Sequence, residues 1–535
     1  MQSILFFWNL LLAILPAADA ITVWQRRNLT YPTPDTPATN LAFTNFYSKI
    51  DALSALKSAL GNATISWPME LEYGSTVARV WTTQRRTYPD AVIYPETTEQ
   101  VSILMQFYSS AHALWTDGFA IMGGGHADFG GAQSPSVIID LQKLAATEII
   151  TNPQKNTLDY AILKVGGGAE AGDVYNALDS TGWAFLGPRA ASIGVGGFLL
   201  GGGIAFQTNR YGVANDNLVG IEVVLVNGTI VYANPYNEYS DLFWATTGGG
   251  WFGFGVITNF YIQAYPDPGE VYVGTIAWGE DKADEVFKTT ASWWENNRNP
   301  DAFPALLYYF KDPTHINALV PIKHRQFTLQ LNALYFGGSQ VQFNETFGLF
   351  LKNADSIQFE TFSLKTLQQY LLVNYPYGYN RLFYGKSHTN STPEFYQSTF
   401  AIYKETVNDV FPGWNGAGPT SNAETAWPHL TSAHITLTSG EWSNSNTTEW
   451  MYTQDRDRMM TYLRGFQSGI GEPSIFDYPN YIAPYSKTRE VWGEENFKRL
   501  LGIKSKYDPK CLFSRGRVPA TEACVLKGLS NTSLD

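Results

Sequence analysis

Between Thr87 and Tyr265, short apolar runs alternate with glycine-rich turns and with stretches of helical spacing. Four runs rich in apolar and β-branched residues predict strands, and two of them lead directly into glycines. Apolar residues spaced three and four apart predict helices, the first of them capped by Thr97 or Thr98. This alternation is typical of an α+β region with many strands. The predicted strands cover 91–94, 119–122, 137–140 and 162–165, and the predicted helices cover 101–108 and 173–178.

The strongest hairpin signal of the chain is the dipeptide Asn227-Gly228. It joins two β-rich runs, 221–226 and 229–232, and it favours the tight turn that twisted antiparallel strands need. We expect these two runs to pair as a hairpin.

The pattern changes after Gly269. Up to Ile470, glycine thins, helical patterns lengthen and aromatic residues cluster. The first half of 328–336, and likewise 434–438, alternates between apolar and polar residues as half-buried strands do. We expect a second domain of antiparallel sheet with helices. A last helical pattern, 496–503, is ended by Pro509.

Charge and composition narrow the choice of partners. Lys and Arg number 36 against 48 Asp and Glu, so the net charge is −12. An acidic chain repels phosphate backbones, and we therefore expect no nucleic-acid partner. Aromatic residues make up 15% of the chain, more than cores alone need. Such a surplus would suit a groove that binds rings or sugars. No ligand spacing typical of a metal site is found, so none is expected.

The N-terminus has the pattern of a targeting signal. An apolar run, 4–16, is followed by Ala18-Asp19-Ala20, with small residues at the positions that signal peptidase recognises. The pattern predicts a signal peptide, 1–20, cleaved after Ala20, and hence a secreted protein. The run is shorter than the roughly 20 apolar residues of a membrane span, so no membrane anchoring is expected.

Two further features agree with secretion. The chain holds only two cysteines, Cys511 and Cys524, which in an oxidising compartment can pair and close a short loop; the alternative is two buried thiols. Seven glycosylation sequons occur, at Asn28, Asn62, Asn227, Asn344, Asn390, Asn446 and Asn531.

Clusters of glycines are the part of the sequence that indicates a bound ligand. A backbone can approach a diphosphate closely where side chains are absent and N–H groups converge. None of the clusters has the spacing of a Rossmann fingerprint or a P-loop, and each alone could be a tight turn. Gathered in about 130 residues, they indicate a fold wrapped around a large anionic cofactor. The clusters lie at 123–125, 166–168, 194–197, 201–203 and 248–250.

The ordered set of these pieces resembles the FAD-binding domain of the vanillyl-alcohol-oxidase superfamily, in its berberine-bridge-enzyme-like branch. The matching pieces are Tyr94–Val101, Met122–His126 with Ile138–Leu141, Gly194–Gly203, Tyr211–Leu218, Asp241–Ala245 and Gly248–Thr258, and near the C-terminus Tyr478–Tyr481 with Leu500–Pro509. The resemblance implies an α+β fold. A two-subdomain FAD-binding domain of PCMH type covers 21–268, an antiparallel-sheet substrate domain covers 269–470, and a C-terminal segment, 471–535, returns to the flavin.

The resemblance also implies the cofactor site. His126 stands where the family's histidine is joined covalently to the flavin's 8α-methyl group, a bond that raises the oxidising power of the flavin. Many relatives have a second link from a cysteine, but that position is Ala190 here. We therefore expect FAD bound through His126 only. The residues expected to bind FAD are Met122, Gly123, Gly124, Gly125, His126, Ala190, Ile193, Gly194, Gly196, Gly197, Gly202, Val256 and Asn480.

Catalysis requires a base, because a proton leaves the substrate as the hydride passes to flavin N5. An ordinary phenol has a pKa near 10 and must be activated by a cation or by hydrogen bonds to serve. The resemblance places Asn480 near N5 and makes a neighbouring tyrosine the base, which we expect to be Tyr478 first and Tyr481 second. In an extended segment, Tyr478 and Asn480 would share a face. The alternative is that both tyrosines only pack.

These observations predict a secreted FAD-linked oxidoreductase that oxidises a small organic molecule, an alcohol or a secondary metabolite, with oxygen reduced to hydrogen peroxide. Oligosaccharide oxidase is the first alternative, and Ala190 in place of cysteine argues against it. Others are a flavin-dependent oxidative cyclase and a non-catalytic flavin binder. Ile193 stands at the position that controls oxygen access in the family, and isoleucine leaves oxidase and dehydrogenase both open.

Overall fold

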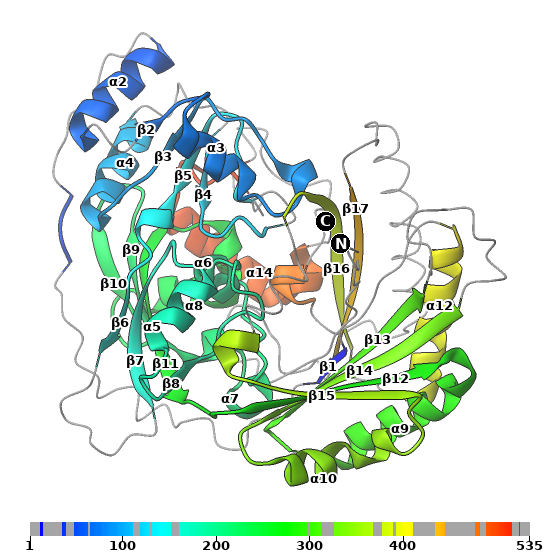
Figure 1. Cartoon of the computed structure of the whole chain (residues 1–535). Helices are drawn as coiled ribbons and strands as arrows, with labels where there is room; N and C mark the ends of the chain where they lie inside the picture. Colours follow the sequence, from blue (N-terminus) through cyan, green and yellow to red (C-terminus); the bar gives the residue numbers. More distant parts are fainter. Residues whose placement is uncertain are drawn as a thin grey trace.

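The computed structural model describes residues 11–13, 35–38, 48–61, 65–110, 118–127, 131–150, 160–297, 299–311, 326–367, 377–388, 392–409, 434–443, 477–481, 488–515 and 524. The described residues form four sheets, three of them with helices packed on them, around a central region that holds the C-terminal helix α14 (Thr488–Tyr507) (Figure 1). Among the described helices, none is both long and apolar enough to cross a bilayer.

The first sheet is mostly parallel. Its order is β2 (Ile65–Ser66), β3 (Ala91–Ile93), β5 (Val137–Asp140), β4 (Phe119–Met122); β3 and β4 both run parallel to β5. Helix α3 (Leu71–Ala78) packs on one face, and α2 (Lys49–Leu60) and α4 (Thr98–Ser110) pack on the other. Because both faces are covered, these strands are continuous apolar runs.

The second sheet is antiparallel and contains the expected hairpin. Its order is β10 (Ile230–Ala233), β9 (Leu218–Val224), β11 (Val256–Pro266), β7 (Ala161–Gly166), β6 (Thr147–Ile150), and β8 (Trp183–Phe185) also pairs with β11. The predicted pairing across Asn227-Gly228 is confirmed, with Gly228 at φ +86°. The helices of this part are α5 (Ala171–Leu178), α6 (Val195–Leu200), α7 (Thr208–Tyr211) and α8 (Ser240–Gly249).

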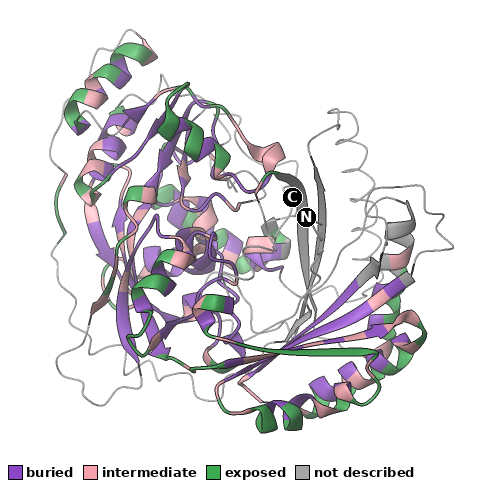
Figure 2. Cartoon of the chain, viewed as in Figure 1, coloured by how far each residue is buried: buried purple, intermediate pink, exposed green. Residues whose placement is uncertain are grey.

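The third sheet begins directly after β11. Its order is β13 (Ala302–Lys311), β14 (Gln326–Phe336), β12 (Val271–Gly279), β15 (Ser356–Phe362), all antiparallel. Helices α9 (Ala283–Asn296), α10 (Gln340–Leu351) and α12 (Pro393–Asp409) lie on its outer side (Figure 1). The strands β13 and β14 are mostly buried where they are described, whereas the edge strand β15 is exposed along most of its length (Figure 2).

A small fourth sheet stands beside the third (Figure 1). The strand β17 (His434–Ser443) pairs with β16 (Tyr379–His388) and with β1 (Leu11–Ala13), both antiparallel. A strand over 434–438 is thereby confirmed. The strand β1 falls inside the predicted signal peptide, so cleavage after Ala20 would remove it.

The C-terminal helix α14 is fastened to the second sheet by a buried lysine. Lys504 and Asp508 are 0% and 1% exposed, and Lys504 Nζ lies 2.7 Å from Asp508 Oδ2. The same ammonium donates to the carbonyl oxygens of Phe252 at 2.9 Å, Gly253 at 2.7 Å and Phe513 at 3.1 Å. Asp508 in turn accepts the backbone N–H groups of Leu512 and Phe513. The loop after α8 and the C-terminal segment are therefore held against each other.

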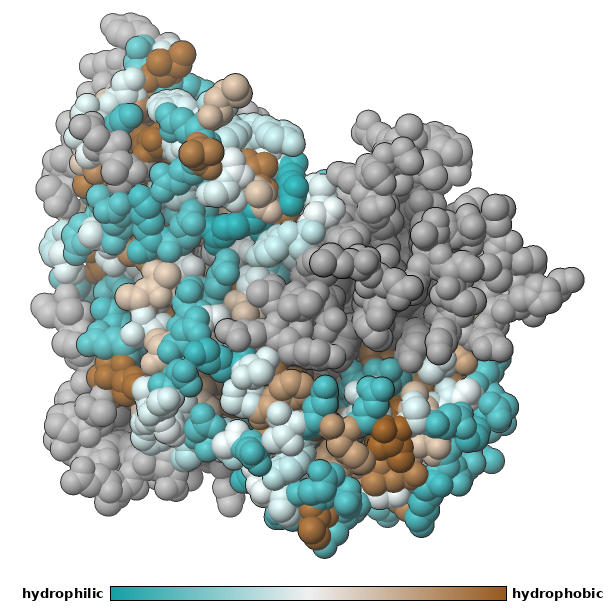
Figure 3. All heavy atoms as spheres, viewed as in Figure 1, coloured by the Kyte–Doolittle hydropathy of each residue, from teal (hydrophilic) through white to brown (hydrophobic). Residues whose placement is uncertain are grey.

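The two cysteines are joined in the structure as a Cys511–Cys524 disulfide, as expected. Two of the seven sequon asparagines, Asn227 and Asn344, fall within the described residues, and both are exposed. The other five, Asn28, Asn62, Asn390, Asn446 and Asn531, lie outside them. The described surface facing the viewer in Figure 3 is largely hydrophilic, with separate apolar patches.

Candidate active site

A cavity of about 310 Å³ lies where the glycine-rich segments meet, a volume within the roughly 300–1,000 Å³ of small-molecule sites. Its wall is built from the loop after β4, the segment before α6, the residues around 250–257, and the C-terminal residues around 478–481. The loop after β4 lies at the carboxyl end of a strand in a parallel sheet, which is where ligands bind in such sheets.

The structure brings most of the expected site residues onto this wall. They are Gly123, Gly124, Gly125, His126, Ala190, Ile193, Gly194, Gly196, Gly197, Val256, Tyr478, Asn480 and Tyr481. Two expected cofactor residues do not line it. The side chain of Met122 is fully buried in the core beneath the glycine loop, and Gly202 lies in the turn after α6, where its carbonyl accepts Asn215 N–H.

The two glycine loops pack backbone to backbone. A Cβ atom built on Gly124 would overlap the amide nitrogen of Gly194, and a Cβ on Gly194 would overlap that of Gly124. Gly125 has φ +75°, which side chains other than glycine's rarely allow. The loops can therefore meet at the cavity only because both carry glycine.

Replacing Gly124 with alanine is expected to push the loops apart and to lower FAD retention at least tenfold, because Cβ would collide with backbone atoms that cannot turn away. The check is flavin absorbance per protein after desalting. Gly74→Ala is the control: Gly74 lies in α3 with open space around its Cβ position, and alanine there favours the helix. Equal flavin content in both variants would contradict the prediction.

An ion-pair network supports the first loop from below. Arg79 Nη1 lies 3.0 Å from Asp140 Oδ2, and its Nη2 donates to Gly123 O at 2.6 Å and lies 3.3 Å from Glu170 Oε1. Asp140 is fully buried at the end of β5 and also accepts Thr76 Oγ1–H at 2.6 Å. Burial raises the pKa of the Asp140 carboxyl, and the Arg79 guanidinium opposes that shift.

His126 is held on two sides. Its Nε2 lies 3.0 Å from Ser192 Oγ, and its ring stacks on Trp81 with centroids 4.8 Å apart and planes 17° apart. Tyr377 approaches with an edge-on ring at 6.2 Å. The imidazole is thus fixed in orientation at the cavity wall, half-buried.

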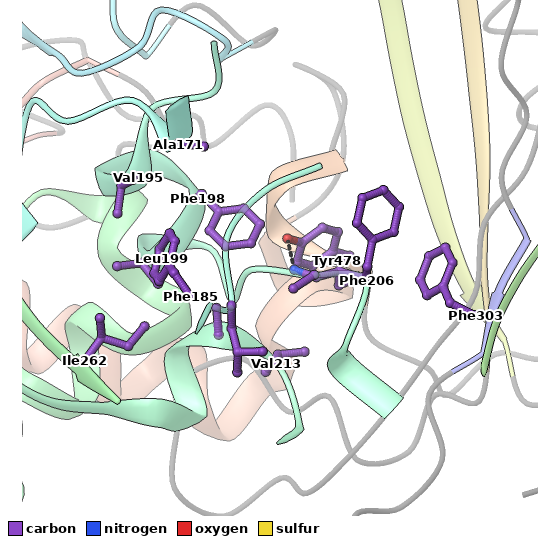
Figure 4. Close-up of a cluster of buried hydrophobic side chains, with 14 of the residues drawn as sticks. Ala171, Phe185, Val195, Phe198, Leu199, Phe206, Val213, Ile262, Phe303 and Tyr478 are labelled. Carbon is purple, nitrogen blue, oxygen red and sulfur yellow. Dashed lines mark hydrogen bonds between the residues drawn. The ribbon is translucent and has the colours of Figure 1, made fainter. Parts of the chain in front are cut away.

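Tyr478 is buried and fully engaged. Its phenol oxygen accepts N–H groups from Gly203 at 3.1 Å, Ile204 at 3.0 Å and Asn480 Nδ2 at 2.9 Å. Figure 4 shows its ring near Phe198 and Phe206. Burial raises the pKa of the Tyr478 phenol, and the three donors only partly offset this. At neutral pH it is therefore a poor proton acceptor.

Tyr481 has the setting that a tyrosine base requires. Its hydroxyl is hydrogen-bonded by Arg189 Nη2, and the Arg189 guanidinium lies 5.9 Å from the centre of its ring. Both residues are partly exposed on the cavity wall. The hydroxyl of Tyr481 is thus on the cavity wall beside a positive charge, whereas that of Tyr478 is enclosed by backbone and Asn480 donors. The geometry thus favours Tyr481 over Tyr478, the reverse of the order expected from sequence.

The segment that carries these residues is not extended. Residues Pro479–Tyr481 form a 3₁₀ turn, closed by Tyr481 N–H donating to Tyr478 O at 3.0 Å. The premise of a shared strand face was therefore wrong, although Asn480 still reaches the Tyr478 hydroxyl. Asn480 Nδ2 also donates to Phe198 O at 2.9 Å, and its Oδ1 accepts Trp251 Nε1–H at 3.1 Å.

The wall fits an anionic dinucleotide with a flat ring. Its described residues include the cations Arg189 and Arg515 but no carboxylate side chain, although the chain as a whole carries −12. The glycine loops expose backbone to the cavity, and Trp81, Phe198 and Trp251 supply aromatic surface. Diphosphate, ribityl chain and isoalloxazine ring are the groups that such a wall accommodates.

Two known protein families match parts of this chain. Residues 89–234 match the family described as FAD binding domain, and residues 477–515 match the family described as berberine and berberine like. Both matched segments contribute to the cavity wall. The chain thus carries the FAD-binding domain and the berberine-like segment, and it is an FAD-linked oxidoreductase.

Curated relatives of this flavoprotein carry related names. This chain is 26% identical over 490 residues to the FAD-dependent monooxygenase drtC of Aspergillus calidoustus, and the match covers 86% of this chain and 87% of drtC. It is 32% identical over 207 residues to the FAD-dependent monooxygenase tpcD of Cochliobolus heterostrophus, but this match spans only 38% of either chain.

Solved structures confirm the fold of the flavoprotein as mixed helix and antiparallel sheet of the berberine-bridge-enzyme type. A variant of berberine bridge enzyme, described as a reticuline dehydrogenase, superposes with a TM-score of 0.72 at 19% identity, covering 87% of this chain and 98% of that one. Xylooligosaccharide oxidase from Myceliophthora thermophila C1, in complex with xylobiose, gives 0.69 at 19% identity, covering 88% and 99%.

Three residues of the flavoprotein site were missed by the sequence analysis: Trp81, Arg189 and Ser192. Arg189 and Ser192 lie close to Ala190 in a segment already singled out, and a cation shortly before the glycine loop that begins at Gly194 was the signal available. Trp81 precedes every glycine cluster, and no local pattern connects it with His126.

Proposed function

We propose that this chain is a secreted oxidase that takes a hydride and a proton from a small organic substrate, an alcohol or a secondary metabolite. Bound FAD would supply the hydride acceptor, its N5, and the route by which the electrons reach oxygen to give hydrogen peroxide. The observation that carries the proposal is the Arg189–Tyr481 pair on the wall of the glycine-lined cavity.

The residues of the chain divide the work. Tyr481, whose hydroxyl is held by Arg189, accepts the proton from the substrate's hydroxyl group. Asn480 is held by Phe198 O and Trp251 Nε1, so its amide presents a fixed edge to the site. The third sheet closes the site from the other side: Phe303 of β13 packs edge-on against Phe206 of the cavity wall, with centroids 5.2 Å apart (Figure 4).

Support for secretion comes from three features together: the predicted cleavage after Ala20, the Cys511–Cys524 disulfide and the exposed sequons at Asn227 and Asn344. The proposal includes glycosylation at the seven sequons named above. Mass spectrometry of the protein recovered from culture medium, before and after removal of N-glycans, would establish the N-terminus and the occupied asparagines.

We further propose a single covalent link to the flavin, through His126. The glycine loop places its ring at the cavity wall, and Ala190 provides no thiol for a second link. Acid precipitation should therefore leave the yellow colour in the wild-type pellet, whereas His126→Ala should release essentially all of it to the supernatant. Flavin in the wild-type supernatant would contradict the link but not the flavoenzyme.

The oxidase activity is tested with a panel of primary and secondary alcohols, phenolic alcohols and oligosaccharides. The expected result is bleaching of the flavin without oxygen, and hydrogen peroxide formed in equal amount to oxidised product with oxygen. Bleaching without peroxide in air would assign a dehydrogenase. Fastest bleaching by an oligosaccharide would favour the carbohydrate-oxidase alternative.

A further inference from the structure

Ser192 is a buried serine that belongs to none of the glycine clusters. It precedes Ile193 and Gly194 on the wall, its side chain is only 4% exposed, and its hydroxyl lies 3.0 Å from His126 Nε2. A hydroxyl can accept the N–H of an imidazole or donate to its bare nitrogen, so this contact couples Ser192 to the tautomer of the ring.

The segment around Ser192 is held rigidly. Ala171 N–H donates to Ile193 O at 3.0 Å, and Gly172 N–H donates to Ala191 O at 2.8 Å, so the first turn of α5 fixes the carbonyl on each side of Ser192. Ile193 N–H closes a turn onto Ala190 O at 3.2 Å. The hydroxyl is therefore placed by backbone contacts that do not depend on the histidine.

The imidazole has little freedom to respond by turning. Trp81 covers one face at 4.8 Å, and Tyr377 stands edge-on at 6.2 Å. With the ring held in this way, Nε2 is engaged by Ser192, and Nδ1 is the other nitrogen that could bond to a flavin. When the Ser192 hydroxyl accepts Nε2–H, the proton of the neutral ring is on Nε2 and Nδ1 carries the lone pair.

We propose that Ser192 is the positioning residue for flavin attachment: its Oγ accepts Nε2–H of His126, so that the lone pair is on Nδ1, the atom that bonds to the flavin. This rests on the proposed covalent link. Joining Nδ1 to the 8α-methyl carbon removes a hydrogen from each partner, the proton of histidine leaving from Nε2 towards Ser192. The two electrons pass through the flavin to oxygen, which takes both protons and leaves as hydrogen peroxide.

The test follows flavin attachment rather than substrate turnover. Apoprotein of the full chain is mixed with FAD in air, and acid-stable flavin in the pellet is measured over time. Ser192→Ala should slow its formation by about 10- to 100-fold, the range seen when a residue that orients a ligating histidine is lost. Ser192→Thr, which keeps the hydroxyl, should restore a rate within a few-fold of wild type.

The matched control is Ser102→Ala. Ser102 is also buried, at 6% exposed, and its hydroxyl donates to Gly228 O, but it lies on α4 outside the cavity wall. Its attachment rate should equal that of wild type.

Two outcomes would overturn the role of Ser192: attachment in Ser192→Ala as fast as in wild type, or loss of all FAD binding, seen as absent quenching of flavin fluorescence, which would make Ser192 merely structural. Absence of acid-stable flavin in wild type would remove the covalent link itself and the inference with it. That failure is seen without any variant, so the two are distinguishable.

Discussion

Replacing Tyr481 with phenylalanine is expected to slow flavin reduction by about 100-fold or more, the usual loss when a general base is removed. The hydroxyl is hydrogen-bonded by Arg189 at the cavity wall, so it is both accessible from the cavity and held in position by a cation. The measurement is the rate constant of flavin bleaching without oxygen, using the fastest substrate of the panel. Arg189→Met should lower the same rate constant, because the Tyr481 hydroxyl would lose the hydrogen bond that holds it in position.

Tyr272→Phe is the control for this experiment. Its hydroxyl donates to Glu270 Oε2 at 3.1 Å on β12, outside the cavity wall, so its removal should leave the rate constant unchanged. An unchanged rate in Tyr481→Phe, together with a large loss in Tyr478→Phe, would assign the base to Tyr478 instead.

Replacing Lys504 with methionine is expected to lower the free energy of unfolding by about 3–5 kcal/mol, because the Asp508 carboxylate would stay buried without its cation. Three carbonyl oxygens would lose a donor as well, among them Gly253 O beside the cavity. Flavin retention should therefore fall together with stability. Urea unfolding followed by tryptophan fluorescence gives the first quantity, and flavin absorbance after desalting gives the second.

Lys498 offers a matched control on the same helix. It pairs with Glu494 at the same four-residue spacing but is 70% exposed, and such surface pairs contribute little. Lys498→Met should leave both the unfolding curve and the flavin content as in wild type. If the two lysine variants behaved alike, the buried lysine would not be the fastening that the geometry indicates.

Local features of the fold could be predicted from the sequence. The buried parallel strands were visible as apolar runs, the hairpin at Asn227-Gly228 from its turn residues, and the end of α14 at Tyr507 from Pro509. Such signals depend on neighbours within a few residues. Because these signals are local, the folded chain shows the strands and turns that they predict.

Site chemistry was harder to predict because it depends on distant contacts. Arg189 and Tyr481 are 292 residues apart in sequence, and no local pattern indicates that they meet. The roles of Tyr478 and Tyr481 stay a prediction, but one premise behind their order was wrong. The sequence analysis treated 478–481 as extended, whereas the segment turns and buries Tyr478 against the backbone of Gly203 and Ile204.

The position of the C-terminal helix also affects the order in which the chain folds and takes up its cofactor. The cavity wall needs residues near 123 and 194 and residues near 480 and 513, so it is incomplete until nearly the whole chain has left the ribosome. Contacts between such distant segments form late in folding, because the closure of long loops is slow. Cofactor loading would then follow translation, and a chain that ends before Tyr478 would emerge colourless.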